Sequence, residues 1–424
     1  MRISIFLLVL YFIFLFNPVS SFCWVADLFN YPFMPEELLV IDKQKQKLFV
    51  VVSKSPITEK YQFLCKTGRK EGDKWEEGDL RTPEGIYFIE SEITKGIDPD
   101  KYGSLAFTLN YPNPVDRIKG KKGHGIWIHG RGSSVNNYRT QGCVALTYQD
   151  IRKLKGAIKL GKTPVIIAKS IKWEVNKFEN EESNVKQIVS SIYRWAKAWS
   201  FREKDFFSFY DPKVFNKNKG GYKSFFYKKS RLFKTYKWID VAVYMPKVVF
   251  GPEYAVSFFY QAYVAYDFSS FGIKRLYWQK RDGTWKIVGD EWRSLDPLYV
   301  KRLYLRDKTS SIITWLKEWK NAWINKDINK YISFYAQDAT LGVLKGKDAI
   351  LKYKKKLWRK DPPKKVNLSD LKVKLSSRGF VVSFIQRYES KRGYKDVGRK
   401  ILLVVPKKNG WLIRSETWKR KLRY

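Results

Sequence analysis

The second half of this 424-residue sequence contains an internal repeat, which constrains the fold more strongly than any other feature. The matching pieces are Trp195-x-x-x-Trp199 with Trp319-x-x-x-Trp323, Ser208-Phe209-Tyr210 with Ser333-Phe334-Tyr335, and Trp285-x-Ile287 before Trp292 with Trp411-x-Ile413 before Trp418. Matching positions are 124 to 126 residues apart, so only small insertions separate the copies. A repeat of that length has the size of a domain. We therefore expect two domains of one fold, at 187–300 and 308–424.

Each copy begins with an amphipathic helical pattern and ends with β-rich segments joined by tight turns. The turns are Arg281-Asp282-Gly283 and Lys407-Lys408-Asn409-Gly410. The pattern resembles the nuclear transport factor 2-like, or SnoaL-like, fold, an α+β cone in which a helix packs inside a curved sheet whose last strands carry W-x-I-x-x-x-x-W. The resemblance implies a domain that holds a ligand in its cone or forms dimers. We identify no catalytic pair in the sequence of either copy.

The residues before the repeat predict a different, mostly β domain over 37–170. Short apolar or β-branched runs alternate there with turns rich in Gly, Pro, Asn and Lys. The expected strands are Leu38–Ile41, Leu48–Val52, Tyr61–Cys65, Gly85–Ile89, Leu105–Leu109, Gly125–His129 and Pro164–Ala168. A capping box of Thr147 and Asp150 predicts one helix. Its apolar positions are Ile151, Leu154 and Ile158. The polar run at 171–186 is interpreted as a linker, so the fold class is multidomain α+β.

The N-terminus has the layout of a secretory signal peptide. Arg2 precedes a mostly apolar run from Ile3 to Phe16, and the small residues Ser20 and Ser21 follow. The apolar run is shorter than the roughly 20 residues that a membrane-spanning helix requires. We therefore expect 1–21 to be a signal peptide cleaved after Ser21, with an uncleaved anchor as the alternative. The expected location is the periplasm or cell envelope.

The formal net charge of +41 bears on partners rather than on fold. Its lysines are spread along the whole chain, as on a solvated basic surface, and no compact RNA-binding signature stands out. An anionic wall polymer fits both the charge and the export signal. We expect no nucleic-acid partner, and membrane contact only through the export signal.

Cysteine and histidine are scarce, and their placement is informative. The three cysteines, Cys23, Cys65 and Cys143, do not make a disulfide scaffold. The two histidines, His124 and His129, are too few for a recognisable zinc site, so we expect no metal and no cofactor. Both histidines lie within 20 residues of Cys143, and a thiol needs a base such as histidine to become a thiolate at neutral pH.

The segment Gly123–Asp150 contains the candidate chemistry. His129 ends an apolar strand, and Gly130 allows the backbone to turn after it. A polar loop rich in Gly, Ser and Asn leads from there to Gly142 and Cys143, and it is long enough to bring the thiol back to the imidazole. On the residues alone, the alternatives are a buried, unreactive cysteine and a structural histidine.

This segment resembles the catalytic domain of YkuD-type L,D-transpeptidases, whose signature is an I-H-G strand end, a loop and a G-C pair. The signature is present as Ile128-His129-Gly130 and Gln141-Gly142-Cys143. Further agreement comes from Leu39-Val40-Ile41-Asp42-Lys43 with Gln46-Lys47-Leu48, from Lys66-Thr67-Gly68, and from the block Gly78 to Tyr87. The resemblance covers about 37–169 and implies a YkuD-type domain at 37–170, followed by the two cones.

The sequence departs from the common S-H-G-C-I-R pattern of that family. Gln141 replaces the second histidine, and Ala145 replaces the arginine after the cysteine. This variant is closer to the L,D-carboxypeptidase-like branch that is linked to cell shape in Gram-negative bacteria. Some members of that branch also carry a C-terminal nuclear transport factor 2-like domain, an argument by analogy.

The resemblance implies a cysteine enzyme that acts on peptidoglycan stem peptides. Cys143 would be the nucleophile, His129 its base, and the carbonyl of Gly130 would fix the imidazole tautomer. Backbone N–H groups of Gly142 and Cys143 would form the oxyanion hole. Water would resolve the thioester in an L,D-carboxypeptidase, and an acceptor amine would do so in an L,D-transpeptidase. Cleavage of a link between wall peptide and lipoprotein is a third alternative.

Four residues near Cys143 are candidates for substrate binding: Arg139, Gln141, Trp127 and His124. The guanidinium of Arg139 could pair with a substrate carboxylate in a bidentate manner, the alternative being a solvated loop arginine. Trp127 could instead pack into the core. His124 lies five residues before His129, which along a strand points it to the opposite side.

Two other functions stay open on the sequence. One is an exported protein that binds an anionic wall polymer and in which Cys143 is vestigial. The other is a nucleic-acid binder, which fits the charge but not the export signal. The intact pairs His129-Gly130 and Gly142-Cys143 favour the enzyme.

Overall fold

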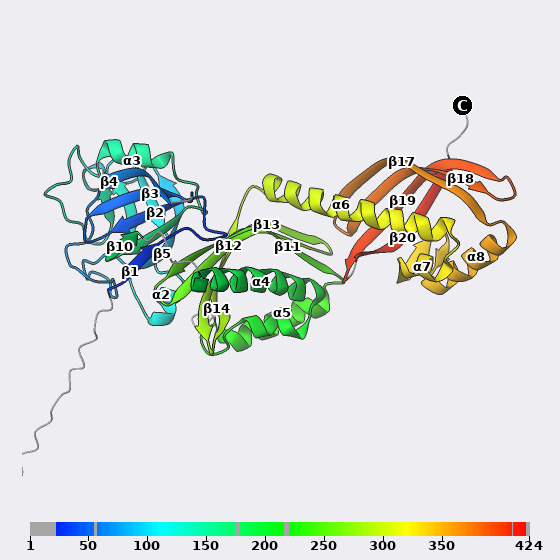
Figure 1. Cartoon of the computed structure of the whole chain (residues 1–424), viewed down its shortest axis with the longest axis horizontal. Coiled ribbons are helices and arrows are strands. Elements are labelled where there is room, and N and C mark those ends of the chain that lie inside the picture. Colours follow the sequence, from blue (N-terminus) through cyan, green and yellow to red (C-terminus); the bar gives the residue numbers. More distant parts are fainter. Residues whose placement is uncertain (1–22, 55–56, 174–178, 216–219, 409, 421–424) are drawn as a thin grey trace, which may run out of the picture.

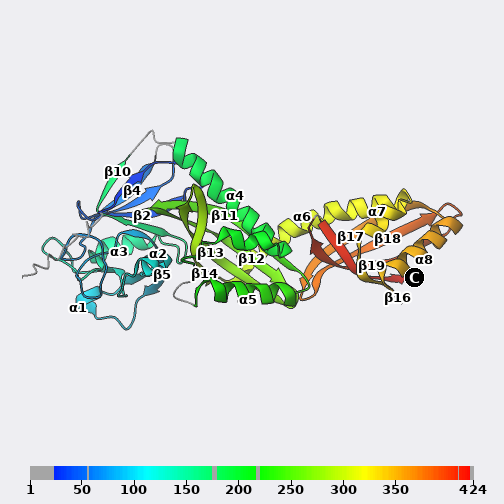
Figure 2. The same ribbon diagram turned by 90° about the horizontal axis from the view of Figure 1, so that it is seen from below.

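The computed structural model of the chain describes residues 23–54, 57–173, 179–215, 220–408 and 410–420. A mostly β domain, a first cone and a second cone follow one another along an elongated molecule (Figures 1 and 2). This arrangement confirms the predicted multidomain α+β class. The predicted signal peptide, 1–21, lies outside the described residues. Within the described part, no helix combines the length and apolarity needed to cross a bilayer.

The first domain is built on an eight-stranded mixed sheet in the order β4-β3-β2-β9-β5-β6-β7-β8. The strands are β2 Glu37–Asp42, β3 Lys47–Val52, β4 Thr58–Leu64, β5 Gly85–Ile93, β6 Ala106–Leu109, β7 Trp127–Gly130, β8 Val144–Leu146 and β9 Pro164–Ala168. The helices are α1 Pro99–Tyr102, α2 Pro114–Lys119 and α3 Tyr148–Lys155. Each expected strand is present, with its ends shifted by a few residues. The short β8 directly after Cys143 was not predicted.

The central strands are continuous apolar runs because both faces of the sheet are covered. On one face, Leu39 and Ile41 of β2 pack in a core that includes residues of α3. On the other face, Leu38 and Val40 join a core that continues into both cones. Because successive side chains of a strand point to opposite faces of the sheet, one apolar run contributes residues to two separate cores.

The helix α3 is capped as predicted. The hydroxyl of Thr147 accepts a hydrogen bond from the N–H of Asp150 at 3.1 Å and donates one to its carboxylate at 2.7 Å. Ile151 and Leu154 are buried, but Ile158 lies beyond the end of the helix.

The expected linker at 171–186 is wrong at both of its ends. Strand β10, Ser170–Trp173, pairs in parallel with β1, Val25–Leu28, because Ile171 has a buried position to fill there. Helix α4 already begins at Glu179, and negative charge is favourable in the first turn of a helix. The polar composition of 171–186 therefore does not indicate a loop throughout, because its second half starts the long helix α4.

The first cone contains α4 Glu179–Phe201, the 3₁₀ helix η1 Lys204–Phe209 and α5 Gly221–Thr235. Its antiparallel sheet runs in the order β11 Ile239–Gly251, β12 Tyr254–Ala265, β13 Phe268–Arg281 and β14 Thr284–Ser294. One face of this sheet packs on the helices through Phe259, Leu276 and Trp278. The opposite face meets the first domain.

The second cone begins with α6 Pro297–Ile324, ahead of the expected start at 308, because Asp296 and Pro297 form a helix start. The other helices are α7 Ile328–Ser333 and α8 Lys347–Lys360. The sheet has the order β16-β15-β20-β19-β18-β17. Its strands are β15 Tyr335–Leu341, β16 Leu344–Lys345, β17 Pro363–Ser376, β18 Gly379–Ser390, β19 Lys395–Lys407 and β20 Gly410–Arg420.

The repeat has a structural meaning in both cones. Trp195 and Trp319 are fully buried on the opening helices α4 and α6. Tyr210 forms a parallel bridge with Ile287, and the matching Tyr335 pairs in parallel with Ile413. The repeated residues therefore join the helical end of each copy to its last strand.

A polar seam ties the first domain to the first cone. Buried Arg275 donates to Glu90 at 2.5 Å, to the carbonyl of Gly161 at 2.7 Å and to Glu291 at 3.1 Å. The hydroxyl of Tyr254 accepts the N–H of Ile86 at 2.8 Å. Because charged groups are costly to bury without partners, these contacts favour one fixed arrangement of the two domains.

Candidate active site

His129 lies on β7, and Cys143 directly precedes the neighbouring parallel strand β8. In the register of β7 with β8, Ile128 is opposite Val144 and His129 is opposite Ala145. Ile128 and Val144 point together into the core. Successive side chains alternate between faces, so His129 and Cys143, each next to a core residue, share the other face. The loop 131–142 thus brings the thiol back to the face of the sheet that carries the imidazole.

The imidazole of His129 is buried, and its Nδ1 lies 3.1 Å from the carbonyl oxygen of Gly130. Because a carbonyl only accepts, this contact requires hydrogen on Nδ1 and leaves Nε2 free to take a proton. Burial lowers the pKa of His129 to about 4, helped by the positive charge of Arg131 and opposed by the bond to Gly130. The imidazole is therefore neutral at pH 7, as a general base must be.

The ring of Tyr102 supports this side of the site. It stands edge-on to His129 with centroids 5.1 Å apart, and it packs on Trp127 at 5.0 Å. Tyr102 could not be recognised as a site residue from the sequence, because an aromatic residue in a short helix is usually a packing residue.

The half-buried thiol of Cys143 donates to the carbonyl of Gly125 at 3.5 Å. Burial raises the pKa of this thiol, against the opposing effects of a backbone hydrogen bond at Trp127 and the charge of Lys74. The resting thiol is thus protonated. Among the described residues no hydrogen bond joins it to His129, and such catalytic contacts often tighten only when substrate binds.

The turn before Cys143 has a built geometry. Gly142 has φ +139°, and a Cβ there would lie 2.9 Å from the carbonyl oxygen of Arg81, so glycine is required. The hydroxyl of Thr82 donates to the Gly142 carbonyl at 2.9 Å, and the hydroxyl of Thr140 donates to the Cys143 carbonyl at 2.6 Å. Both threonines are buried, and neither was singled out from the sequence as a site residue.

The expected oxyanion hole needs one correction. The N–H of Gly142 donates to the hydroxyl of Thr140 at 3.0 Å, so it is already occupied. Within the described part of the chain, no hydrogen bond engages the N–H of Cys143. Of the two expected donors, Cys143 is therefore the one available for an oxyanion.

The four candidate substrate-binding residues have different surroundings. Arg139 and Gln141 are exposed in the loop before Cys143, and Trp127 is half-buried beside it. The side chain of His124 is 82% exposed, lies outside the strands and is 3.8 Å from Glu77. His124 was expected to lie on a strand, so its predicted facing does not apply. In the described residues, no group of three His, Cys, Asp or Glu side chains is arranged to hold a metal.

The architecture is thus a mostly β domain that contains the candidate cysteine and histidine, followed by two α+β cones. The L,D-transpeptidase catalytic domain (YkuD) matches residues 36–167, and the Cds6 C-terminal NTF2-like domain matches 187–291 and 311–417. The chain thus carries an L,D-transpeptidase (YkuD) catalytic domain, followed by two domains of the Cds6 C-terminal NTF2-like family.

The chain is also similar to individual proteins. "Putative L,D-transpeptidase YafK" of Escherichia coli K12 is 30% identical over 145 residues, which are 32% of this chain and 53% of that protein. The chain thus spans about half the length of the curated relatives it matches. Bd1075 of Bdellovibrio bacteriovorus is 29% identical, with a TM-score of 0.49, over 62% of this chain and 94% of that one. Pgp2 of Campylobacter jejuni, a helical cell shape determining protein, is 26% identical, with a TM-score of 0.49, over 60% and 91%.

Proposed function

We propose that the chain is an exported, peptidoglycan-processing cysteine enzyme of the cell envelope. The observation that carries the proposal is the register of β7 with β8, from which we infer that Cys143, directly before β8, and the buried His129 share one face, together with the contact of Gly130 to the imidazole. The match of residues 36–167 to the L,D-transpeptidase catalytic domain supports the substrate class. The name of the relative YafK, "Putative L,D-transpeptidase", supports the same class of reaction. Export rests on the sequence of residues 1–21.

The proposed reaction begins when Nε2 of His129 takes the proton of the Cys143 thiol. The thiolate attacks the carbonyl carbon of the third residue of a stem tetrapeptide, at its L,D bond. The N–H of Cys143 stabilises the oxyanion of the tetrahedral intermediate; loss of such a donor typically costs ~10²–10³ in rate. The C–N bond then breaks, His129 returns the proton to the leaving amine, and a thioester with Cys143 remains.

Two nucleophiles can resolve the thioester. Water, deprotonated by His129, releases a tripeptide and restores the thiol, which is L,D-carboxypeptidase activity. The amine of a second stem peptide would give a cross-link instead, which is L,D-transpeptidase activity. We propose Arg139, Gln141, Trp127 and His124 as substrate contacts. The guanidinium of Arg139 is exposed and would pair with the carboxylate of the substrate.

The test is incubation of the exported form, the residues after Ser21, with purified muropeptides, followed by mass spectrometry. We expect tetrapeptides to become tripeptides or dimers, and Cys143→Ala to abolish the change. If wild type and variant both leave every muropeptide intact, the enzymatic proposal fails. The net charge of +41 would then favour binding of an anionic wall polymer, measured by co-sedimentation with insoluble wall.

A further inference from the structure

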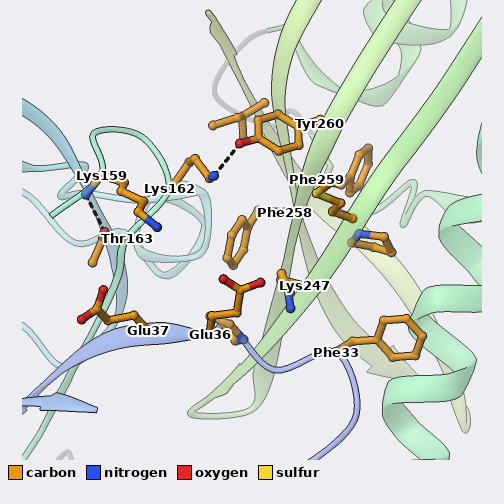
Figure 3. A pocket seen from close by; sticks show the side chains of 14 residues that line it. Phe33, Glu36, Glu37, Lys159, Lys162, Thr163, Lys247, Phe258, Phe259 and Tyr260 are labelled. Atoms are coloured by element: carbon orange, nitrogen blue, oxygen red, sulfur yellow. Dashed lines mark hydrogen bonds between the residues drawn. The ribbon is translucent and has the colours of Figure 1, made fainter. Parts of the chain in front are cut away.

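A groove of about 320 Å³ lies at the seam between the first domain and the first cone, away from Cys143 (Figure 3). Its floor is apolar and includes Phe258 and Ile273 from the first cone. Lys159 and Lys162, from the loop between α3 and β9, line one end in the view of Figure 3, and Phe33 lies toward the other. Pockets of this size that are mostly apolar with a few charged groups commonly hold small ligands.

The wall contributed by β11 is shaped by a β-bulge. The pairing of β11 with β12 shifts between Tyr244 and Lys247, and Met245 within the bulge has a φ of +52°. A bulky residue in this region is strained, and bulges commonly re-aim a side chain near a site. Met245 is 53% exposed, and its sulfur lies 3.9 Å from the hydroxyl of Tyr299. A flexible thioether of this kind adapts to apolar ligands of varied shape.

The charges around the groove are predominantly positive. Lys162 donates to the neutral hydroxyl of Tyr260, and Lys247 donates to a backbone carbonyl at 3.1 Å, so both keep their charge unpaired. For Lys159, no hydrogen bond or ion pair of its ammonium occurs among the described residues. Of the acidic residues that line the groove, Glu37 pairs with Lys60 outside it at 2.9 Å, which leaves Glu36. Among the described residues that line the groove, three lysines without an ion pair therefore outnumber the one acidic residue without one, Glu36.

We propose that this groove binds a single-chain anionic amphiphile, such as a fatty-acid carboxylate. Its head group would lie between Lys159 and Lys162, where charge-assisted hydrogen bonds form. Its chain would cover the floor of Phe258 and Ile273 and the side chain of Met245. A cationic amphiphile of the same length would meet the three lysines and bind less well. Because both domains line the groove, the ligand would also add to the contacts across the seam.

The test is isothermal titration of the whole chain with dodecanoate, kept below its micellar concentration, and with dodecyltrimethylammonium as the matched cation. We expect one dodecanoate per chain and roughly tenfold weaker binding of the cation. The double variant Lys159→Glu/Lys162→Glu should lose at least about tenfold in dodecanoate affinity. Met245→Asp should weaken binding similarly, and since this side chain is exposed, the fold should be retained. The control Lys364→Glu lies on the second cone and should change nothing.

Several results would overturn the proposal. They are a flat dodecanoate titration of the wild type, equal affinity for the two probes, and unchanged affinity in both groove variants. A last arm uses phosphatidylglycerol vesicles, which the basic chain should bind independently of Lys159 and Lys162. Vesicle binding that is lost in the double variant while dodecanoate binding persists would also contradict a free, single-chain ligand.

Discussion

Nδ1 of His129 lies 3.1 Å from the carbonyl oxygen of Gly130, the residue that follows it in β7. This contact fixes the tautomer in which Nδ1 carries the hydrogen and donates it to the carbonyl, while Nε2 carries none and can accept a proton. Burial keeps the imidazole neutral and the neighbouring Cys143 thiol protonated. The resting site is therefore an uncharged pair, and the thiolate must form when substrate is bound.

Replacing the base should stop the reaction without unfolding the domain. We expect His129→Gln to lower kcat for tetrapeptide hydrolysis or cross-linking by roughly 10²–10⁴-fold, which is what a positioned acid–base group contributes. The comparison is His124→Gln: this other histidine is 82% exposed, and as a proposed substrate contact its loss should raise KM and leave kcat unchanged. Equal losses in the two variants would remove His129 from its proposed role.

In a plot of kcat/KM against pH, activity should be lost only at an unusually acidic pH. The imidazole must be neutral to act as a base, and its pKa is lowered to about 4, so activity should fall as pH drops through about 4. The measurement is kcat/KM between pH 3 and 8, with circular dichroism to check that the chain stays folded. An acid limb centred near 6.5, the ordinary value for histidine, would contradict the buried, neutral base.

Thr140 should act as a positioning residue for the Cys143 turn. Its hydroxyl accepts the Gly142 N–H at 3.0 Å and donates to the Cys143 carbonyl at 2.6 Å. We expect Thr140→Val to lower kcat by about 10–10²-fold with little change in KM, because a misplaced nucleophile loses its near-attack geometry. The control Thr147→Val, which removes the cap of α3, should cost about 1 kcal/mol of stability and leave kcat unchanged. A rise in KM alone would argue that Thr140 contacts substrate instead.

The stability of the interface between the first domain and the first cone should depend on the buried guanidinium of Arg275. Arg275→Leu leaves Glu90 and Glu291 without that partner, and because both acids are partly exposed we expect a loss of only about 1–3 kcal/mol in unfolding free energy. Lys364→Leu breaks an exposed pair with Glu389 and should leave the unfolding free energy nearly unchanged. Thermal and urea unfolding measure both. Equal effects would mean that the seam adds nothing to stability.

Lys354 in the second cone should destabilise the fold at neutral pH. It is buried over the rings of Trp323 and Tyr331, and burial lowers its pKa to about 8. The unfolded chain binds this proton more tightly, so stability should rise with pH between about 8 and 10.5. We expect Lys354→Met to raise Tm at pH 7 and to flatten that rise. A lower Tm for the variant would show that the ammonium stabilises the cone.

Sequence and structure agree best where one pattern fixes one contact. The I-H-G strand end predicted the bond between His129 and Gly130, and the tryptophan repeat predicted two cones with the same first-helix anchors. Local patterns could not show contacts between distant segments. The threonine supports of the Cys143 turn are of that kind, as Thr82 lies sixty residues before Gly142. The same is true of the seam around Arg275, whose partners come from two domains.

The central claim is that Cys143 forms a covalent thioester with a stem peptide. The direct test is rapid quenching of the exported form with a tetrapeptide muropeptide, followed by intact mass and peptide mapping. The account predicts an adduct equal to the muropeptide minus its terminal residue, on Cys143, absent in Cys143→Ala and greatly reduced in His129→Gln. Product formation with no adduct on Cys143 at any quench time, and with full activity in Cys143→Ala, would contradict it.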